Sequence, residues 1–168
     1  MVHVVLLEPE IPENTGNIAR SCIGMNAILH LIKPYGFFLT DKKLKRSGVD
    51  YWEKLKLIEH NSYEDFINTI KNKKHLIYFL TRYGKNKPNE ISFKNKNDVY
   101  IVFGKESQGI PKNILKENEI KTIRIPASKN IRSFNLSNCV AILLYEYSKQ
   151  NNYEGLEIFE PHKPLFVK

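Results

Sequence analysis

The sequence predicts an α/β domain with a mostly parallel sheet flanked by helices. Strand-like and helix-like segments alternate along almost the whole chain with short connections, which is typical of strand–helix–strand units. The chain has 168 residues, of which 42% are hydrophobic and 26% are charged. This length and composition suit one domain with a buried core.

Each expected strand is a short apolar run bounded by turn residues. The first, 2–7, leads into a loop in which Pro9 and Pro12 exclude both further pairing and a helix. The second is closed by Pro34, and a later one lies just before Gly104. The runs after the first are 29–32, 76–80, 99–103 and 120–125.

The expected helices begin at residues that cap a helix N-terminus or suit its first turn. Asn14 or Thr15 caps a helix that runs to about Asn26, and Ser62 caps one over 63–71. Apolar side chains recur at helical spacing along one face of each. Three further helices are expected: a short basic one from Asp41 to Arg46, one from Pro111 to about Glu117, and a final one over 137–150.

The net charge of +8 indicates an anionic partner, although a solvated lysine face would give the same value. The arginines are more informative. Only five occur beside 21 lysines, and four of them lie in or beside the motifs described below. Arginine binds phosphate or carboxylate with a planar, two-pronged geometry that lysine lacks, so this placement favours nucleic acid.

The cysteines and the N-terminus predict a cytoplasmic protein with no membrane partner. Cys22 and Cys139 lie in helix-like segments, where we expect buried free thiols. The chain opens directly on a strand-like run with no basic leader or cleavage site. Its apolar runs are far shorter than the roughly 18 residues of a membrane span.

Several chemistries lack their motifs in this sequence. A G-x-G-x-x-G pattern does not occur, which argues against a dinucleotide fold and against the commoner methyltransferase fold. The segment 104–109 completes neither a P-loop nor a nucleophile elbow. The five histidines lack metal-ligand spacing, so we expect no metal.

Three polar stretches follow the expected strands, at the sheet edge where ligands bind in parallel α/β folds. In 14–20, helix amides and Arg20 favour an anion. In 102–111, two glycines let the backbone approach a ligand closely. In 125–138, Arg132, hydroxyls and amides precede a helix. A capped core helix explains the first stretch locally, and a strand-to-helix turn explains the second. Ordinary capping explains one or two of the polar groups in the third stretch, but not all of them.

Taken together, these stretches resemble the three sequence motifs of the SPOUT class of RNA methyltransferases. The matching segments are 8–20, 103–111, 125–126 and 132–138. The segments 30–37 and 45–52 resemble the small branch that methylates the wobble ribose of tRNA cytidine or uridine. The departures are mild: Lys105 stands where proline is common, Phe134 where leucine or methionine is usual, and Ser47 where alanine is usual.

This resemblance implies a C-terminal trefoil knot in a single domain over 1–152, followed by a tail or docking arm at 153–168. It also implies a homodimer, S-adenosylmethionine as cofactor and the anticodon region of tRNA as partner. The cofactor would contact Leu80, Gly104, Ile125 and Ser133. The catalytic set would be Arg20, acting across the dimer, with Asn14, Glu106, Ser133 and Asn135, and RNA would contact Arg20, Lys43 and Arg46.

The implied reaction moves a methyl group onto a ribose 2′-hydroxyl, largely by positioning the reactants. A guanidinium group resists deprotonation, so we expect Arg20 to hold phosphate or stabilise the developing alkoxide rather than act as the base. Three alternatives remain: 2′-O-methylation at another tRNA or rRNA site, a non-catalytic RNA-binding module, and a nucleotide-binding regulator. The sequence does not identify the tRNA species.

Overall fold

The computed structural model describes residues 1–37, 49–94 and 97–161. The expected helix from Asp41 to Arg46, and with it the expected RNA contact Lys43, lies outside the described residues. In chain order, the elements are β1 (Val2–Leu7), α1 (Pro12–Gly24), β2 (Ile28–Ile32), η1 (Val49–Lys54), β3 (Leu57–His60), α3 (Tyr63–Ile70), β4 (His75–Leu80), η2 (Pro88–Glu90), β5 (Asp98–Phe103), α4 (Lys112–Glu117), η3 (Glu119–Lys121), β6 (Thr122–Ile123) and α5 (Leu136–Gln150).

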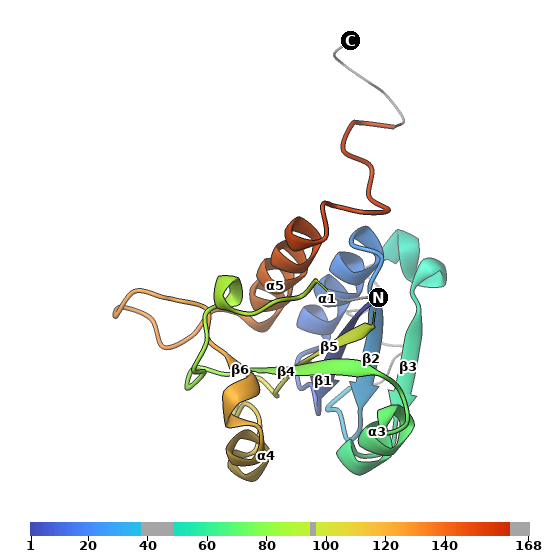
Figure 1. The fold of residues 1–168 in the computed structure, drawn as a ribbon. Helices are drawn as coiled ribbons and strands as arrows, with labels where there is room; N and C mark the ends of the chain where they lie inside the picture. Colours follow the sequence, from blue (N-terminus) through green and yellow to red (C-terminus); the bar gives the residue numbers. More distant parts are fainter. Residues whose placement is uncertain (38–48, 95–96, 162–168) are drawn as a thin grey trace.

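The strands form one parallel sheet in the order β3-β2-β1-β5-β4-β6. Helices α1 and α5 cover one face, and α3 and α4 cover the other (Figure 1). The predicted α/β architecture is therefore confirmed. Among the residues that the structure describes, no helix is long and apolar enough to cross a membrane.

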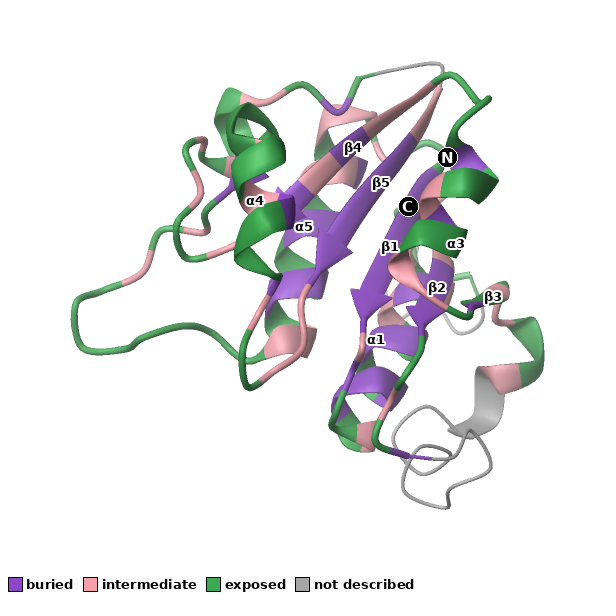
Figure 2. Cartoon of the chain, turned by 90° about the horizontal axis from the view of Figure 1, so that it is seen from below, coloured by how far each residue is buried: buried purple, intermediate pink, exposed green. Residues whose placement is uncertain are grey.

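Two apolar layers hold the helices on the sheet, and the central strands between them are buried along their length (Figure 2). On one face, Ile18 and Cys22 of α1 pack with Val140 and Leu143 of α5. On the other, side chains of α3 and α4 pack against β4 and β5. Cys22 is a buried free thiol, and so is Cys139, as the sequence predicts.

Helix α1 corrects one prediction. The helix begins at Pro12 and not at Asn14 or Thr15, and its N-cap residue Ile11 makes no side-chain cap. Proline suits the first helical position because its missing N–H has no partner there in any case. Asn14 is consequently free to hydrogen bond outside the helix. By contrast, Ser62 caps α3 as predicted, its hydroxyl accepting from the amide of Asp65.

The two outer strands also differ from expectation. Strand β3, which was not predicted, pairs with β2. Two of its four side chains are exposed, so its sequence carries no clear strand pattern. Strand β6 spans only Thr122–Ile123, where a strand over 120–125 was expected, since η3 occupies the residues before it. Edge strands bury less apolar surface, which weakens the sequence pattern.

Strand β6 is held from two sides by one continuous stretch of chain. It pairs with the end of β4, and the amide of Thr81 also donates to the carbonyl of Ile123 (2.9 Å). Beyond a tight turn, the amide of Asn86 donates to Thr122 (3.2 Å), and the amide of Arg124 donates to Asn86 (2.8 Å). At Gly84, a Cβ would lie 2.2 Å from the carbonyl carbon of Ile123. The chain from β4 to Asn86 therefore flanks β6 closely.

Three histidines that are far apart in sequence form a buried ladder across β1, β2 and β3. His3 Nδ1 hydrogen bonds to His30 Nε2 (2.9 Å), and His30 Nδ1 hydrogen bonds to His60 Nε2 (2.8 Å). Phe66 and Tyr100 pack against the rings. Burial lowers the pKa of all three histidines, and that of His30 falls to about 3. The ladder is neutral at physiological pH.

This ladder predicts that mild acid destabilises the fold. Unfolded histidine binds a proton near pH 6.5, whereas folded His30 does not until about pH 3. The contribution of this histidine to the free energy of unfolding is therefore fully present above pH 6.5 and is lost as the pH falls below that value. A single histidine of this kind contributes about 1.4 kcal/mol per pH unit within that window. Urea unfolding should therefore show the free energy of unfolding fall by at least ~1.5 kcal/mol from pH 7 to pH 5.

That range lies above the pH at which most carboxyl groups titrate. His30→Gln should flatten the dependence, whereas His75→Gln, outside the ladder, should preserve it. A wild-type stability that is unchanged between pH 7 and pH 5 contradicts the prediction.

Candidate functional site

A cleft of about 560 Å³ opens at the carboxyl ends of β1, β4, β5 and β6. Parallel α/β sheets place ligands at this edge because the loops there converge. All three polar stretches singled out in the sequence contribute to its wall. So do the four residues expected to hold the cofactor: Leu80, Gly104, Ile125 and Ser133.

Glu106 ties the loop after β5 to the beginning of α1. Its carboxylate accepts from the amides of Glu10 (2.9 Å) and Ile11 (3.3 Å), and from Asn14 Nδ2 (3.0 Å). A helix N-terminus carries unsatisfied N–H groups and a partial positive charge, so an anion is stabilised there. Glu106 thus joins a loop over ninety residues away in sequence to the residues that lead into α1 and to the side chain of Asn14.

The hydrogen bonds continue from Asn14 to the third polar stretch. Asn14 is only 6% exposed, and its Oδ1 accepts from Asn135 Nδ2 (3.0 Å). Asn135 Oδ1 accepts in turn from the amide and the hydroxyl of Ser137 (2.8 and 2.7 Å), at the beginning of α5. An ionised carboxylate only accepts hydrogen bonds, so Glu106 fixes the orientation of both amides. One continuous series of hydrogen bonds therefore connects the three loops.

A second set of contacts joins the loops after β1 and β5. The Glu10 carboxylate accepts from the amide and the hydroxyl of Ser107 (2.9 and 2.8 Å), and these bonds lower the pKa of Glu10. Lys105 Nζ lies 2.8 Å from Glu8 Oε2, which raises the pKa of Lys105. Lys105 therefore links the two loops by an ion pair at a position where the resemblance leads one to expect proline.

Gly104 lets the loop after β5 fold back on itself. The amide of Gly109 donates to the carbonyl of Lys105 (2.8 Å), and Gly109 adopts a positive φ of 74°. A Cβ on Gly104 would lie 2.1 Å from the carbonyl carbon of Gly109. Only glycine fits this position, and the absence of a side chain leaves bare backbone at the cleft.

Comparison with known proteins identifies the family. A model of the SpoU rRNA methylase family matches residues 1–145. The chain belongs to this family. A Mycoplasma genitalium protein named as a candidate tRNA (cytidine(34)-2′-O)-methyltransferase is 49% identical over 160 residues, covering 94% of this chain and 95% of its own length. A Bacillus subtilis protein named in the same way is 43% identical, covering 93% and 97%.

Solved structures agree with this assignment to the SpoU family. A candidate RNA methyltransferase from Bacillus anthracis has a TM-score of 0.87 at 46% identity, covering 94% of this chain and 99% of its own. A structure described as addressing 2′-OH methylation of C/U34 on tRNA has a TM-score of 0.84 at 35% identity, covering 92% and 98%. AviRb from Streptomyces viridochromogenes, solved with AdoMet, has the same fold at 20% identity, with a TM-score of 0.79 over 89% of this chain and 57% of its own.

Not all the expected site residues of this SpoU-family chain meet in the cleft. Asn14, Glu106, Ser133 and Asn135 line it. Arg20 is exposed on α1 and is not among the lining residues. Arg46, like Lys43, falls outside the part of the chain that the structure describes.

Other residues line the cleft without having been given a role from the sequence. Arg82, Tyr83 and Arg124 come from the turn after β4 and the end of β6. Residues 81–84 directly follow the expected strand 76–80, at the sheet edge where ligands bind, and arginine is scarce in the chain. Those two signals together could have identified the cluster, but only the sheet order brings Arg124 beside the turn.

The loop geometry predicts opposite outcomes for two glycine-to-alanine substitutions. Gly104→Ala forces a Cβ into backbone, so it should displace the loop and weaken S-adenosylmethionine binding at least about tenfold, which corresponds to about 1.4 kcal/mol. Gly24→Ala, near the end of α1, meets nothing within 4 Å and should leave binding unchanged. Calorimetric titration and thermal unfolding of both variants test this. Equal behaviour of the two would refute it.

Proposed function

We propose that this protein transfers a methyl group from S-adenosylmethionine to the ribose 2′-hydroxyl of the first anticodon nucleotide, a cytidine or uridine, of cytoplasmic tRNA. The observation that carries the proposal is the hydrogen-bonded chain from Glu106 through Asn14 to Asn135, which joins all three motif loops around one cleft. Relatives named for this reaction match nearly the full length of the chain.

The cleft suits the proposed cofactor in size and chemistry. Its volume of about 560 Å³ falls in the usual range for small-molecule sites. Leu80 and Ile125 offer apolar surface, Gly104 offers bare backbone, and Ser133 offers a hydroxyl from an exposed loop. When bound, S-adenosylmethionine supplies an electrophilic methyl group on a sulfonium ion. The chain itself has to position the acceptor hydroxyl against that group.

We propose a homodimer in which Arg20 of one subunit acts at the cleft of the other. Arg20 is exposed on α1 and lies outside its own cleft lining, so a second copy is the route by which it reaches an acceptor ribose. Near α1, a shallow groove with a predominantly apolar lining includes Met25, Ile142 and Tyr145. Ile142 is 38% exposed and Tyr145 is 52% exposed, which suits a surface that a partner covers.

We further propose that the chain around β6 forms the crossing of a trefoil knot. In support, residues 122–124 hydrogen bond to the end of β4 on one side and to Asn86 on the other. A short strand with the same continuous stretch of chain hydrogen-bonded on both sides is what we expect where the chain passes through a loop. The segment from Ile125 to Asn135 then leads into α5 as an open loop beside the cleft (Figure 1).

The function predicts where the methyl group is found. Total tRNA incubated with the protein and labelled S-adenosylmethionine should carry label on the 2′-oxygen of the first anticodon nucleotide, located by nuclease digestion and nucleoside mapping. Asn135→Ala should lower the rate at least about tenfold, equivalent to about 1.4 kcal/mol. Label in another part of tRNA or in rRNA would overturn the proposed position. Cofactor binding without labelling of any RNA would favour a non-catalytic RNA-binding module.

The dimer predicts complementation between two impaired subunits. Arg20→Ala and Asn135→Ala remove residues that act, in this proposal, on opposite sides of a shared site. Mixed dimers should regain up to half of the wild-type sites, whereas each variant alone should stay at least about tenfold below the wild-type rate. A fully active monomer in sedimentation would contradict the shared site.

A further inference from the structure

The mouth of the cleft carries a basic and aromatic ledge formed by Arg82, Tyr83 and Arg124. The guanidinium carbon of Arg82 lies 4.6 Å from the centroid of the Tyr83 ring, and Arg82 Nη2 donates to the Tyr83 hydroxyl. Arg124 Nη1 donates to the carbonyl of Arg82. All three residues line the cleft, and all three are exposed.

The ledge is held in place by contacts between its turn and β6. The amide of Gly84 donates to the carbonyl of Thr81 (3.1 Å), which closes a tight turn with Arg82 and Tyr83 at its tip. Gly84 packs so closely on Ile123 that no Cβ fits between them. The turn is thereby fixed against β6, while the Tyr83 side chain stays 61% exposed. Two long side chains are thus positioned without being buried.

The charge around the ledge favours an anionic ligand. Among the lining residues, one is acidic, and that carboxylate, of Glu106, already accepts three N–H groups. Five lining residues are basic, of which Lys105 is already paired with Glu8 and four remain: Arg82, Lys112, Arg124 and Arg132. Such a surface binds phosphate strongly.

We propose that this ledge binds single-stranded RNA next to the methylated nucleotide, with a base stacked on the Arg82–Tyr83 pair and a phosphate held by the two arginines. This proposal rests on the proposed function and names a contact surface beyond Arg20, Lys43 and Arg46. Unpaired RNA bases stack on aromatic rings and guanidinium planes, and the backbone follows the positive charge. The ledge offers an aromatic ring, a guanidinium plane and positive charge, all within one turn and the adjacent end of β6.

The test measures binding of a fluorescent anticodon stem–loop RNA with cytidine at the wobble position, by anisotropy at several salt concentrations. Tyr83→Ala should weaken binding at least about fivefold, whereas Tyr83→Phe, which keeps the ring, should stay within about twofold of wild type. Arg82→Ala should also weaken binding and lower the logarithmic salt slope by roughly 0.7–0.9.

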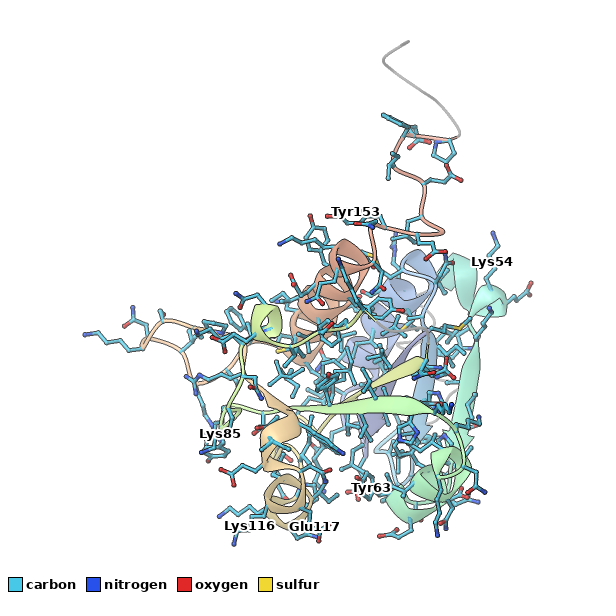
Figure 3. All side chains as sticks on the ribbon, in the orientation of Figure 1. Lys54, Tyr63, Lys85, Lys116, Glu117 and Tyr153 are labelled. Carbon is cyan, nitrogen blue, oxygen red and sulfur yellow. The ribbon has the colours of Figure 1, made fainter. Side chains whose placement is uncertain are left out.

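Lys85→Ala is the matched control, because it removes the same charge three residues further along. Lys85 pairs with Glu119 (2.8 Å) and does not line the cleft. In Figure 3, Lys85 lies near the β6 edge of the sheet, whereas Lys54 lies near the opposite edge. Its variant should bind RNA within about twofold of wild type, and S-adenosylmethionine affinity should be unchanged in all the variants.

The outcomes separate this proposal from the function on which it rests. If wild type binds the stem–loop without methylating it and the ledge variants lose binding, the proposed function fails and the ledge stands. If wild type methylates the RNA but Tyr83→Ala and Arg82→Ala bind it normally, the ledge is refuted. It is refuted equally if these variants lose cofactor affinity, which would assign the ledge to the cofactor pocket.

Discussion

The contact on which the site depends most is the Glu106 carboxylate at the N-terminus of α1. Its oxygens accept from two backbone amides and from Asn14. Because an ionised carboxylate cannot donate, it turns the Asn14 amide so that the carbonyl faces Asn135. One charged group therefore fixes side chains on three loops that are far apart in sequence. The electrostatics of the helix terminus stabilise that charge where the site needs it.

The rest of the cleft is arranged around this fixed edge. The pairs Glu10–Ser107 and Glu8–Lys105 reinforce the link between the first two loops. The loop that carries Ser133 is exposed and joins the edge through Asn135. Hydrogen bonds and an ion pair therefore hold the loops on one side of the cleft, while an exposed loop borders the other side.

Much of the fold follows from local patterns in the sequence. The apolar runs of β1, β4 and β5 and the Ser62 cap of α3 were predicted because burial and capping act over a few residues. Strand β3 was missed because two of its four side chains are exposed and leave no apolar pattern. Strand β6 was predicted too long because η3 takes up the residues just before it. The cap assigned to Asn14 was wrong for another reason: its true partners, Glu106 and Asn135, lie about a hundred residues away. Likewise, nothing local indicates that His3, His30 and His60 meet.

The most direct measurement is a double-mutant cycle on S-adenosylmethionine affinity. Glu106 and Asn135 make no direct hydrogen bond and are joined through Asn14. Calorimetry should therefore give Glu106→Gln, Asn135→Ala and the double variant similar losses, with a coupling energy of at least ~1 kcal/mol. Losses that simply add, so that the double variant is weakened by the product of the two single effects, would show that the loops act independently and that the chain through Asn14 does not hold the site.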